Sequence, residues 1–274
     1  MTGALFAGVD AGSTTVKAVL VDASGAVRGS AIAPGGPLPR ETAERVIDEA
    51  LAVAGGVRGD IACLVSTGYA REAIAGRSRS VTEISCHARG ARALVPGARG
   101  LIDIGGQDSK AVALDANGGV DRFEMNDKCA AGTGRFLEVM ARTLHVPLGE
   151  SGAVALSSAS PAAISSTCTV FAESEVISLV ARGAPVADIL AGVCRIVAAR
   201  AAALATRARV AAPVAMTGGV ARNAAVVRFL GEALGAPLTV PETPELTGAL
   251  GAALAARDTA AKQAAQGAPA KETT

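Results

Sequence analysis

The sequence predicts an α/β protein built from two duplicated domains. The first observation is an internal repeat: residues 10–27 read DAGSTTVKAVLVDASGAV and residues 103–120 read DIGGQDSKAVALDANGGV, at an offset of 93 without a gap. The second is the pattern common to both copies, a strand, a glycine-rich turn, a second strand and a hairpin turn, with helical patterns after it. Internal repeats of this kind indicate a duplicated architecture.

Each copy predicts a three-stranded β-meander. The apolar runs Leu5–Val9 and Gly100–Ile102 are typical of buried strands. The second strands are expected at Lys17–Val21 and Lys110–Leu114, followed by Asp-Ala-Ser-Gly or Asp-Ala-Asn-Gly turns into a third strand. Each half therefore begins with a glycine turn at its first bend.

Helical patterns follow the meander in both halves. In the first half they cover Glu41–Ala54 and about Ser85–Leu94, with a buried strand at Ile61–Ser66 between them. In the second half the expected helices are about Thr133–Leu144, Phe171–Ala181, Val186–Ala205, Ala221–Leu234 and Pro244–Ala256.

The expected domain boundary lies near Pro96–Gly97. It gives a first domain of residues 1–96, a second of residues 97–258, and a tail of residues 259–274. The tail lacks apolar periodicity, and its composition predicts disorder. Whether the final helix packs back across the boundary is left open.

Composition excludes several classes of function. Of the 274 residues 50% are hydrophobic, and the formal net charge is +1, which gives no reason to expect a nucleic-acid or anionic-membrane partner. The N-terminal apolar stretch lacks the basic region of a signal peptide, and the Ala-rich segment 186–205 carries three charged residues. A cytoplasmic protein without a membrane span is expected, and its five cysteines predict no disulfide framework.

The two glycine turns are predicted to bind the phosphates of ATP. Turns of this composition expose backbone N–H groups to phosphate oxygens, and Gly12 and Gly105 allow close approach of the backbone. Lys17 either neutralises phosphate charge or lies on the strand. The other candidates in the two turns are Ser13, Thr14, Thr15 and Gly106.

Acidic residues near these turns suggest metal and water chemistry. Asp10 and Asp103 end their strands and are expected to hold Mg²⁺ through water. Gln107 and Asp108 are candidates to orient or deprotonate the attacking water. A third glycine cluster, residues 216–223, lies between an apolar run and a helix, which suits close approach of a nucleoside at Gly218, Gly219 and Asn223.

Together these motifs resemble those of the acetate kinase, sugar kinase, heat-shock chaperone and actin superfamily. The resemblance implies two duplicated ribonuclease H-like, actin-like ATPase domains with the nucleotide in the cleft between them. No P-loop segment is present. The positions that carry the resemblance are Asp10, Gly12, Ser13 and Thr14 in the first phosphate loop, Asp103, Gly105, Gly106 and Gln107 in the second, and Gly218 and Gly219 in the adenosine motif.

Two cysteines have an unusual context. Cys129 lies in NDKCAAGTG and Cys168 in SSTCTVFAE, each just before a predicted helix whose N-terminal dipole favours a thiolate. Their separation of 39 residues (168 − 129) matches no zinc-finger spacing, and two thiolates are half the ligands of a Cys-ligated iron–sulfur cluster. A two-fold dimer would supply the other half. Small buried hydrophobes are the alternative interpretation.

The segments NDKCAAGTGRFLE and SSTCTVFAESEV closely resemble the activators of 2-hydroxyacyl-CoA dehydratases and the related ATPase subunits of benzoyl-CoA reductases. The resemblance extends over about residues 4–257 and includes VDAGSTTVK, STGYAR, EISCHARGA, DIGGQDSK and TGGVARN. It implies one 4Fe–4S cluster per homodimer, held by Cys129 and Cys168, with Gly132 and Gly134 in the cofactor-binding motif.

The resemblance also implies an ATPase coupled to electron transfer in anaerobic metabolism. Flavodoxin or ferredoxin would be the donor. A 2-hydroxyacyl-CoA dehydratase or a similar double-cluster reductase would receive the electron.

Two other functions stay open. One is the ATP-module subunit of a benzoyl-CoA reductase, which pairs with a different homologous subunit. The other is a small-molecule kinase such as an N-acetylglucosamine kinase, which would share the nucleotide cleft and need no cysteine pair. Cys63 and Cys194 are expected in the core, whereas the adjacent Cys86 and His87 are the one competing candidate for a metal or nucleophile site.

Overall fold

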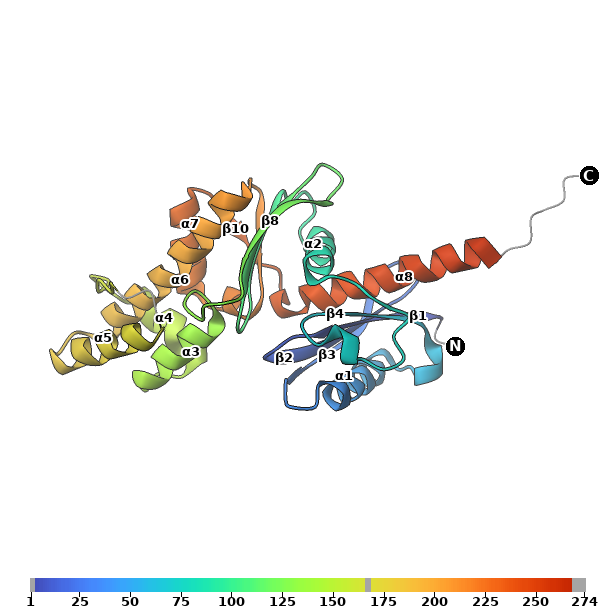
Figure 1. Cartoon of the computed structure of the whole chain (residues 1–274), viewed down its shortest axis with the longest axis horizontal. Helices are drawn as coiled ribbons and strands as arrows, with labels where there is room; N and C mark the ends of the chain where they lie inside the picture. The colour runs from blue at the N-terminus through green and yellow to red at the C-terminus, as the bar shows by residue number, and fades with distance from the viewer. Residues whose placement is uncertain (1–2, 166–168, 268–274) are drawn as a thin grey trace, which may run out of the picture. The chain divides into compact units, whose positions relative to one another are not determined.

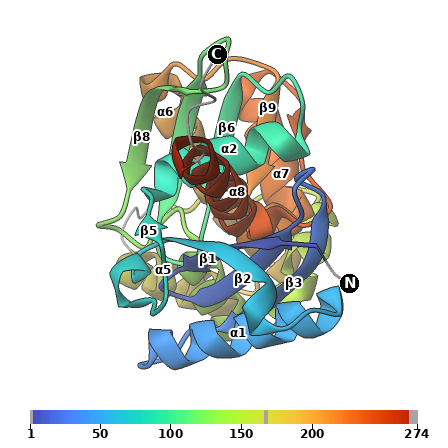
Figure 2. The same cartoon turned by 90° about the vertical axis from the view of Figure 1, so that its right-hand side faces the viewer.

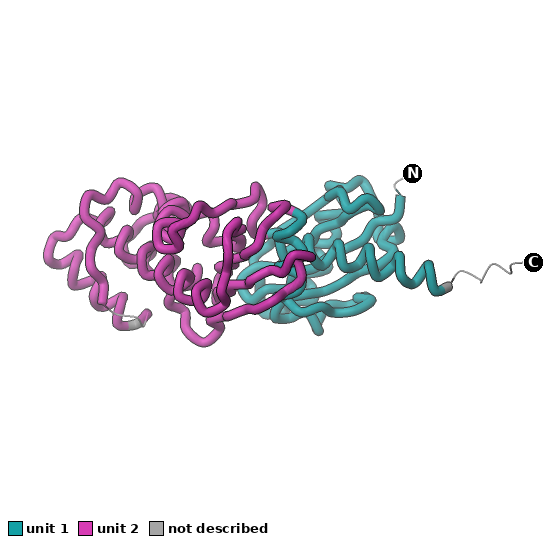
Figure 3. The backbone as a smooth tube through the Cα atoms, turned by 90° about the horizontal axis from the view of Figure 1, so that it is seen from above, with its two compact units in different colours: residues 1–93, 246–274 teal, residues 94–245 magenta. Residues whose placement is uncertain are grey.

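The computed structural model describes residues 3–165 and 169–267 and divides the chain into two compact units. Unit 1 comprises the chain up to Ala93 and again from Leu246, and unit 2 comprises Leu94–Glu245, as coloured in Figure 3. Each unit has its own five-stranded sheet.

The sheet of unit 1 has the strand order β3-β2-β1-β4-β5. Strands β1, β2 and β3 pair antiparallel as the predicted meander, whereas β4 and β5 join parallel to β1. The strands are β1 (Leu5–Ala11), β2 (Thr15–Val21), β3 (Val27–Pro34), β4 (Ile61–Thr67) and β5 (Arg79–Ser80).

Helices cover both faces of this sheet, which explains why every residue of β1 is buried. Helix α1 packs on β2 and β3, and α8 packs on β1, β2 and β4 from the other face, as Figures 1 and 2 show. Helix α2 runs beside α8. The helices of unit 1 are α1 (Pro39–Ala54), the short η1 (Arg58–Asp60) and η2 (Arg71–Ala73), α2 (Glu83–Leu94) and α8 (Thr247–Gly267).

Helix α8 joins unit 1 through backbone-to-backbone packing at glycines. A Cβ at Gly8 of β1 would overlap the backbone of α8 at Ala249 and Ala253, and one at Gly251 would overlap the carbonyl of Cys86 in α2. Such approach requires glycine. The chain from Leu246 onward, expected in the second domain from its sequence position, therefore belongs to unit 1, and the change of unit at Leu94 lies close to the expected boundary.

The sheet of unit 2 repeats the sheet of unit 1 strand for strand, in the order β8-β7-β6-β9-β10. Its first three strands are an antiparallel meander and the next two are parallel. The predicted fold of two duplicated actin-like α/β domains is thereby confirmed. The strands are β6 (Gly100–Ile104), β7 (Ser109–Leu114), β8 (Val120–Asn126), β9 (Val214–Thr217) and β10 (Leu238–Thr239).

More helices accompany this second sheet than the first. The long α6 is central: its apolar side contacts β6, β7 and β8, and it also packs on α3, α4, α5 and α7. The helices are α3 (Gly134–Thr143), η3 (Leu148–Glu150), α4 (Ser151–Leu156), α5 (Thr169–Ala181), α6 (Val186–Ala208), η4 (Gly219–Arg222), α7 (Ala224–Leu234) and η5 (Pro244–Leu246).

Within the described ranges, one helix, α6, has the length and apolar composition that a membrane span needs. Inside unit 2, 61% of its most apolar window is buried, as in a core helix.

Some elements differ from the expected ones. The two-residue strands β5 and β10 and the six-residue α4 were not predicted, because segments this short carry no clear periodicity. Helix α8 continues to Gly267, through the first residues of the expected tail, with residues 261–266 exposed. Residues 268–274 lie outside the described ranges.

Candidate functional site

A buried acid and lysine lie at the end of β1 in unit 1. Asp10 stands opposite Lys17 of β2 in the strand register, and the Lys17 Nζ lies 3.1 Å from the Asp10 Oδ2. Asp10 is only 2% exposed. Its second oxygen, Oδ1, has no hydrogen-bond partner among the described residues. A buried carboxylate oxygen without a partner is unfavourable unless a cation or a donor comes to it.

Unit 2 has the equivalent pair, with a different set of partners. Asp103 stands opposite Lys110, and the Lys110 Nζ lies 3.7 Å from Asp103 Oδ2 and 2.6 Å from Asp108 Oδ2. Thr217 at the end of β9 donates from Oγ1 to Asp103 Oδ1 at 2.7 Å. Lys110 is 1% exposed, so the two carboxylates neutralise a fully buried amine.

A threonine–glycine step completes each acid–lysine pair, and the sequence analysis missed it. Thr67 of β4 stands opposite Asp10, as Thr217 stands opposite Asp103. Each threonine precedes a glycine with positive φ, Gly68 (90°) or Gly218 (83°). A Cβ at Gly68 would meet Asp10 Oδ1 at 2.5 Å. The recurrence of Thr-Gly after an apolar run could have revealed this second repeat.

The two glycine turns have the same backbone hydrogen bond. In the first glycine turn (residues 12–15) the N–H of Gly12 donates to the Thr15 carbonyl at 3.1 Å, and in the second (residues 105–108) Gly105 donates to Asp108 at 2.9 Å. The side chains at the tips, Ser13, Thr14 and Gln107, are exposed. The structure thus places the predicted phosphate-binding residues in matched turns, with Asp108 turned toward Lys110.

The second glycine turn is bonded directly to the start of α3. The N–H groups of Gly134 and Arg135 donate to the carbonyls of Gly105 and Gly106 at 2.9 and 2.8 Å. A Cβ at Gly134 would lie 3.1 Å from the Gly105 carbonyl oxygen, so glycine permits this close contact. These are the first two amides of the helix that follows Cys129.

The third glycine cluster supports the same end of the sheet. Gly218 packs against the backbone of Ile104 and donates its N–H to the Pro244 carbonyl at 3.0 Å. Asn223, expected in the nucleotide site, caps α7: its Oδ1 accepts from the Val226 N–H at 3.0 Å and its Nδ2 donates to Ser151 Oγ at 3.2 Å. Both ends of its amide are therefore occupied within unit 2.

Cys129 lies on the loop of residues 127–133, here called the cysteine loop, between β8 and α3. The loop is held at two carbonyls: Asn126 Nδ2 donates to Cys129 at 2.8 Å, and Ser109 Oγ donates to Gly132 at 2.6 Å. Gly132 has a φ of 94° and packs on the side chain of Arg200. The half-buried Cys129 packs against the core of unit 2.

The other described cysteines are buried. Burial raises the pKa of the Cys194 thiol to about 12 and that of the Cys86 thiol to about 11. Both thiols therefore stay protonated at neutral pH, which argues against a nucleophilic role for Cys86 beside His87. Cys63 is buried in β4 as expected. Cys168 lies outside the described residues.

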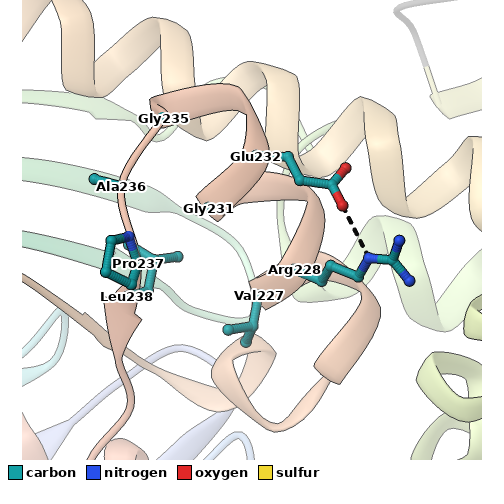
Figure 4. A pocket seen from close by; sticks show the side chains of 8 residues that line it. All are labelled: Val227, Arg228, Gly231, Glu232, Gly235, Ala236, Pro237 and Leu238. Atoms are coloured by element: carbon teal, nitrogen blue, oxygen red, sulfur yellow. Dashed lines mark hydrogen bonds and ion pairs between the residues drawn. The ribbon is translucent and has the colours of Figure 1, made fainter.

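Metal-binding groups of three or more His, Cys, Asp or Glu side chains are absent from residues 3–165 and 169–267. A shallow hollow of unit 2 lies at the C-terminal end of α7 and is lined by mainly apolar side chains (Figure 4). Its one ion pair joins Arg228 to Glu232 at 2.8 Å, one turn apart on the same helix. It brings together none of the residues predicted to bind a cofactor.

Comparison with known proteins extends this geometry. The activator of lactoyl-CoA dehydratase from Anaerotignum propionicum is 48% identical over 261 residues, 93% of this chain and 98% of that protein. The solved activator of 2-hydroxyisocaproyl-CoA dehydratase from Clostridium difficile with bound ADPNP superposes with a TM-score of 0.91 at 42% identity, covering 98% and 99% of the two chains. A benzoyl-CoA reductase subunit of Thauera aromatica is 33% identical over 261 residues, 90% of this chain and 91% of that one.

These relatives bear out the resemblance that the glycine and cysteine motifs indicated. The family model described as the BadF/BadG/BcrA/BcrD ATPase family matches residues 7–256, which include both glycine turns, both acid–lysine pairs and the cysteine loop. On that match and these identities, the chain belongs to the BadF/BadG/BcrA/BcrD ATPase family.

Proposed function

We propose that this protein is an ATP-dependent electron-transfer activator. It would deliver a low-potential electron from a 4Fe–4S cluster at a homodimer interface to a 2-hydroxyacyl-CoA dehydratase or a related CoA-ester reductase. One observation carries the proposal: the cysteine loop continues into α3, whose first two amides bond to the second glycine turn, so the Cys129 segment and this turn form one piece of structure.

The ATP part is supported by family membership and by the ADPNP present in the solved relative. The glycine turn of each unit would bind phosphate oxygens through its backbone N–H groups, aided by the hydroxyls of Ser13, Thr14 and Thr15. Gly218 and Gly219 would lie against the nucleoside. Gln107 at the exposed tip and Asp108 beside Lys110 are the candidates to orient the attacking water.

Magnesium fits the residues at the end of β1. The buried Asp10 Oδ1 lacks a partner among the described side chains, and a hydrated cation would supply one. Lys17 alone leaves the carboxylate half satisfied, since it reaches only Oδ2. In unit 2 both Asp103 oxygens have neighbours, Thr217 and Lys110. We therefore assign the principal Mg²⁺ contact to Asp10 and a secondary one to Asp103.

An iron–sulfur cluster fits the chemistry of Cys129. Thiolates are the ligands that hold such clusters, and Cys129 is the described cysteine whose side chain reaches the surface. Cys168, immediately before α5, is the second proposed ligand, with two more thiolates from another copy of the chain. When bound, the cluster would supply a one-electron couple of low potential.

A homodimer is supported by the surface of α5. Three large apolar side chains of this helix are exposed: Phe171 by 67%, Ile177 by 54% and Val180 by 46%. Several large apolar side chains exposed on one helix mark a candidate interaction surface. A second copy packed on α5 would cover these side chains, and a homodimer is what one shared cluster requires.

The proposed cycle begins when flavodoxin or ferredoxin reduces the protein in the cytoplasm. ATP·Mg²⁺ then binds the glycine turns, and the second turn shifts with its phosphate contacts. Because Gly134 and Arg135 are bonded to that turn, α3 and the cysteine loop move with it. The altered dimer passes one electron to the partner enzyme, and ATP hydrolysis restores the first conformation.

The test is reconstitution of the full-length protein with iron and sulfide without oxygen. The proposal expects about four irons per dimer, a brown colour and an electron paramagnetic resonance signal on reduction. Cys129→Ser should lose the iron and the signal and keep its affinity for ADPNP. Cys194→Ser is the matched control, since that buried thiol should leave the iron content unchanged.

A colourless, iron-free wild-type protein after this treatment would rule out the cluster. The alternative of a benzoyl-CoA reductase ATP module rests on the lower identity of 33% to the Thauera aromatica protein, and it predicts no stable cluster-containing homodimer from this chain alone. A small-molecule kinase would instead show ATP consumption stimulated by a substrate such as N-acetylglucosamine.

A further inference from the structure

The cysteine loop is joined to the strands on each side of it by two side chains that the family motifs leave without a role. Ser109 is the first residue of β7 and Asn126 the last residue of β8, and they stand opposite each other in the strand register. Ser109 directly follows the second glycine turn, and Asn126 directly precedes the cysteine loop.

Both side chains donate into the cysteine loop. The buried Ser109 Oγ bonds to the Gly132 carbonyl at 2.6 Å, and Asn126 Nδ2 bonds to the Cys129 carbonyl at 2.8 Å and the Ala131 carbonyl at 3.4 Å. The loop also closes on itself, because the hydroxyl and N–H of Thr133 donate to the Ala130 carbonyl at 2.6 and 3.0 Å.

The far end of the loop is bonded to the second glycine turn through α3, as described above. The turn and the loop are thus linked by two routes: through the α3 amides of Gly134 and Arg135, and through the side chains of Ser109 and Asn126. The second route ends at the carbonyl of Cys129 itself. Coupling between two places in a protein runs through such continuous packed and hydrogen-bonded contacts.

We propose that Ser109 and Asn126 are positioning residues that transmit the nucleotide state of the second glycine turn to Cys129. The Asn126 amide fixes the backbone of Cys129. The Ser109 side chain bonds to Gly132, and Ser109 directly follows Asp108, the last residue of the second glycine turn. A shift of the turn on phosphate therefore changes the exposure of the Cys129 thiol. The inference rests on the proposed function in taking residues 105–108 as a nucleotide-binding turn.

The experiment measures thiol accessibility and needs no cluster. Full-length protein is freed of iron with a chelator and treated with iodoacetamide with and without ADPNP·Mg²⁺. Trypsin then cleaves after Lys128 and Arg135, so Cys129 lies alone in peptide 129–135, while Cys168 lies in peptide 143–182. Mass spectrometry of peptide 129–135 gives the alkylation rate of Cys129.

In the wild type the nucleotide should change this rate by about fivefold or more, the lower end of usual coupling between sites. Asn126→Ala should bring the ratio of the two rates to within about twofold of one and leave ADPNP affinity unchanged. Ser109→Ala should have the same effect on the ratio and serves if Asn126→Ala does not fold. The matched control is Asn117→Ala in the exposed turn at the other end of the same hairpin.

If Asn126 has a purely local role, Asn126→Ala would change the basal alkylation rate of Cys129 but keep the ratio of the rates with and without ADPNP·Mg²⁺. That result would overturn the inference. The same holds if wild-type protein binds ADPNP and the Cys129 rate does not respond. If ADPNP does not bind at all, calorimetry shows it directly, and the proposed ATP function is overturned together with this inference.

Discussion

At the scale of single residues, the two halves use the same three side-chain positions with different partners. Asp10, Lys17 and Thr67 match Asp103, Lys110 and Thr217 in strand register. Asp103 is held by a lysine and a threonine, whereas one oxygen of Asp10 is left for a ligand. Equivalent positions therefore have unequal sets of hydrogen-bond partners.

That difference predicts unequal effects of substitution. Asp10→Asn should lower ATP hydrolysis by about 10–100-fold and raise the Mg²⁺ concentration for half-maximal rate, as expected for a partner of metal-bound water. Asp103→Asn should mainly lower thermal stability, because it leaves the fully buried Lys110 with a single carboxylate. Steady-state ATPase assays over a magnesium series and thermal melts distinguish the two.

Asp115→Asn is a suitable control for both variants. This exposed turn residue accepts backbone hydrogen bonds from Asn117 and Gly119, which an asparagine oxygen can also accept. Equal magnesium dependence in Asp10→Asn and Asp115→Asn would contradict the assignment of the metal contact to Asp10.

At the scale of elements, α8 packs through close contacts at glycines as well as through the buried Leu250 and Leu254. Gly251→Ala would place a Cβ against the Cys86 carbonyl of α2. We expect a loss of about 1–3 kcal/mol in the free energy of unfolding, because overpacking against backbone outweighs the gain in helix propensity. Urea denaturation followed by circular dichroism would measure it.

Gly59→Ala is the comparison for this packing effect. A Cβ there meets nothing within 4 Å, and the glycine lacks a positive φ, so the substitution should be nearly neutral. If both variants unfold at the same urea concentration, the close packing of α8 on α2 contributes little to stability.

Most of the helices and strands could be predicted from the sequence, but fewer of the side-chain contacts between them could. The repeat predicted both meanders, because strand, turn and hairpin residues recur at fixed spacing. The roles of Thr67 and Thr217 were not predicted, because these threonines lie beside Asp10 and Asp103 only through parallel pairing with a strand distant in the sequence. The capping role of Asn223 was also missed, although it is a local contact in which Oδ1 accepts from the Val226 N–H, and an Asn directly before a helix is a preferred N-cap.

At the scale of the whole molecule, the chain leaves unit 1 at Ala93 and returns to it at Leu246. Removing everything after Glu245 should therefore unfold unit 1, because β1 and β4 would lose the helix that covers one of their faces. Limited proteolysis should then digest residues 1–93 first. Truncation after Ala260 removes mainly exposed residues and should leave the melting temperature unchanged.

The Thr-Gly step also shows how many more residues unit 2 has than unit 1 between equivalent positions. The first strands of the two halves are 93 residues apart, whereas Thr67 and Thr217 are 150 apart, so unit 2 carries 57 extra residues (150 − 93) between these landmarks. Cys129 and Cys168 both lie in that stretch. After an ancestral duplication, one copy could lengthen a connection outside the sheet and acquire new chemistry there. The inherited strands, with their acids, lysines and threonines, would not have had to change.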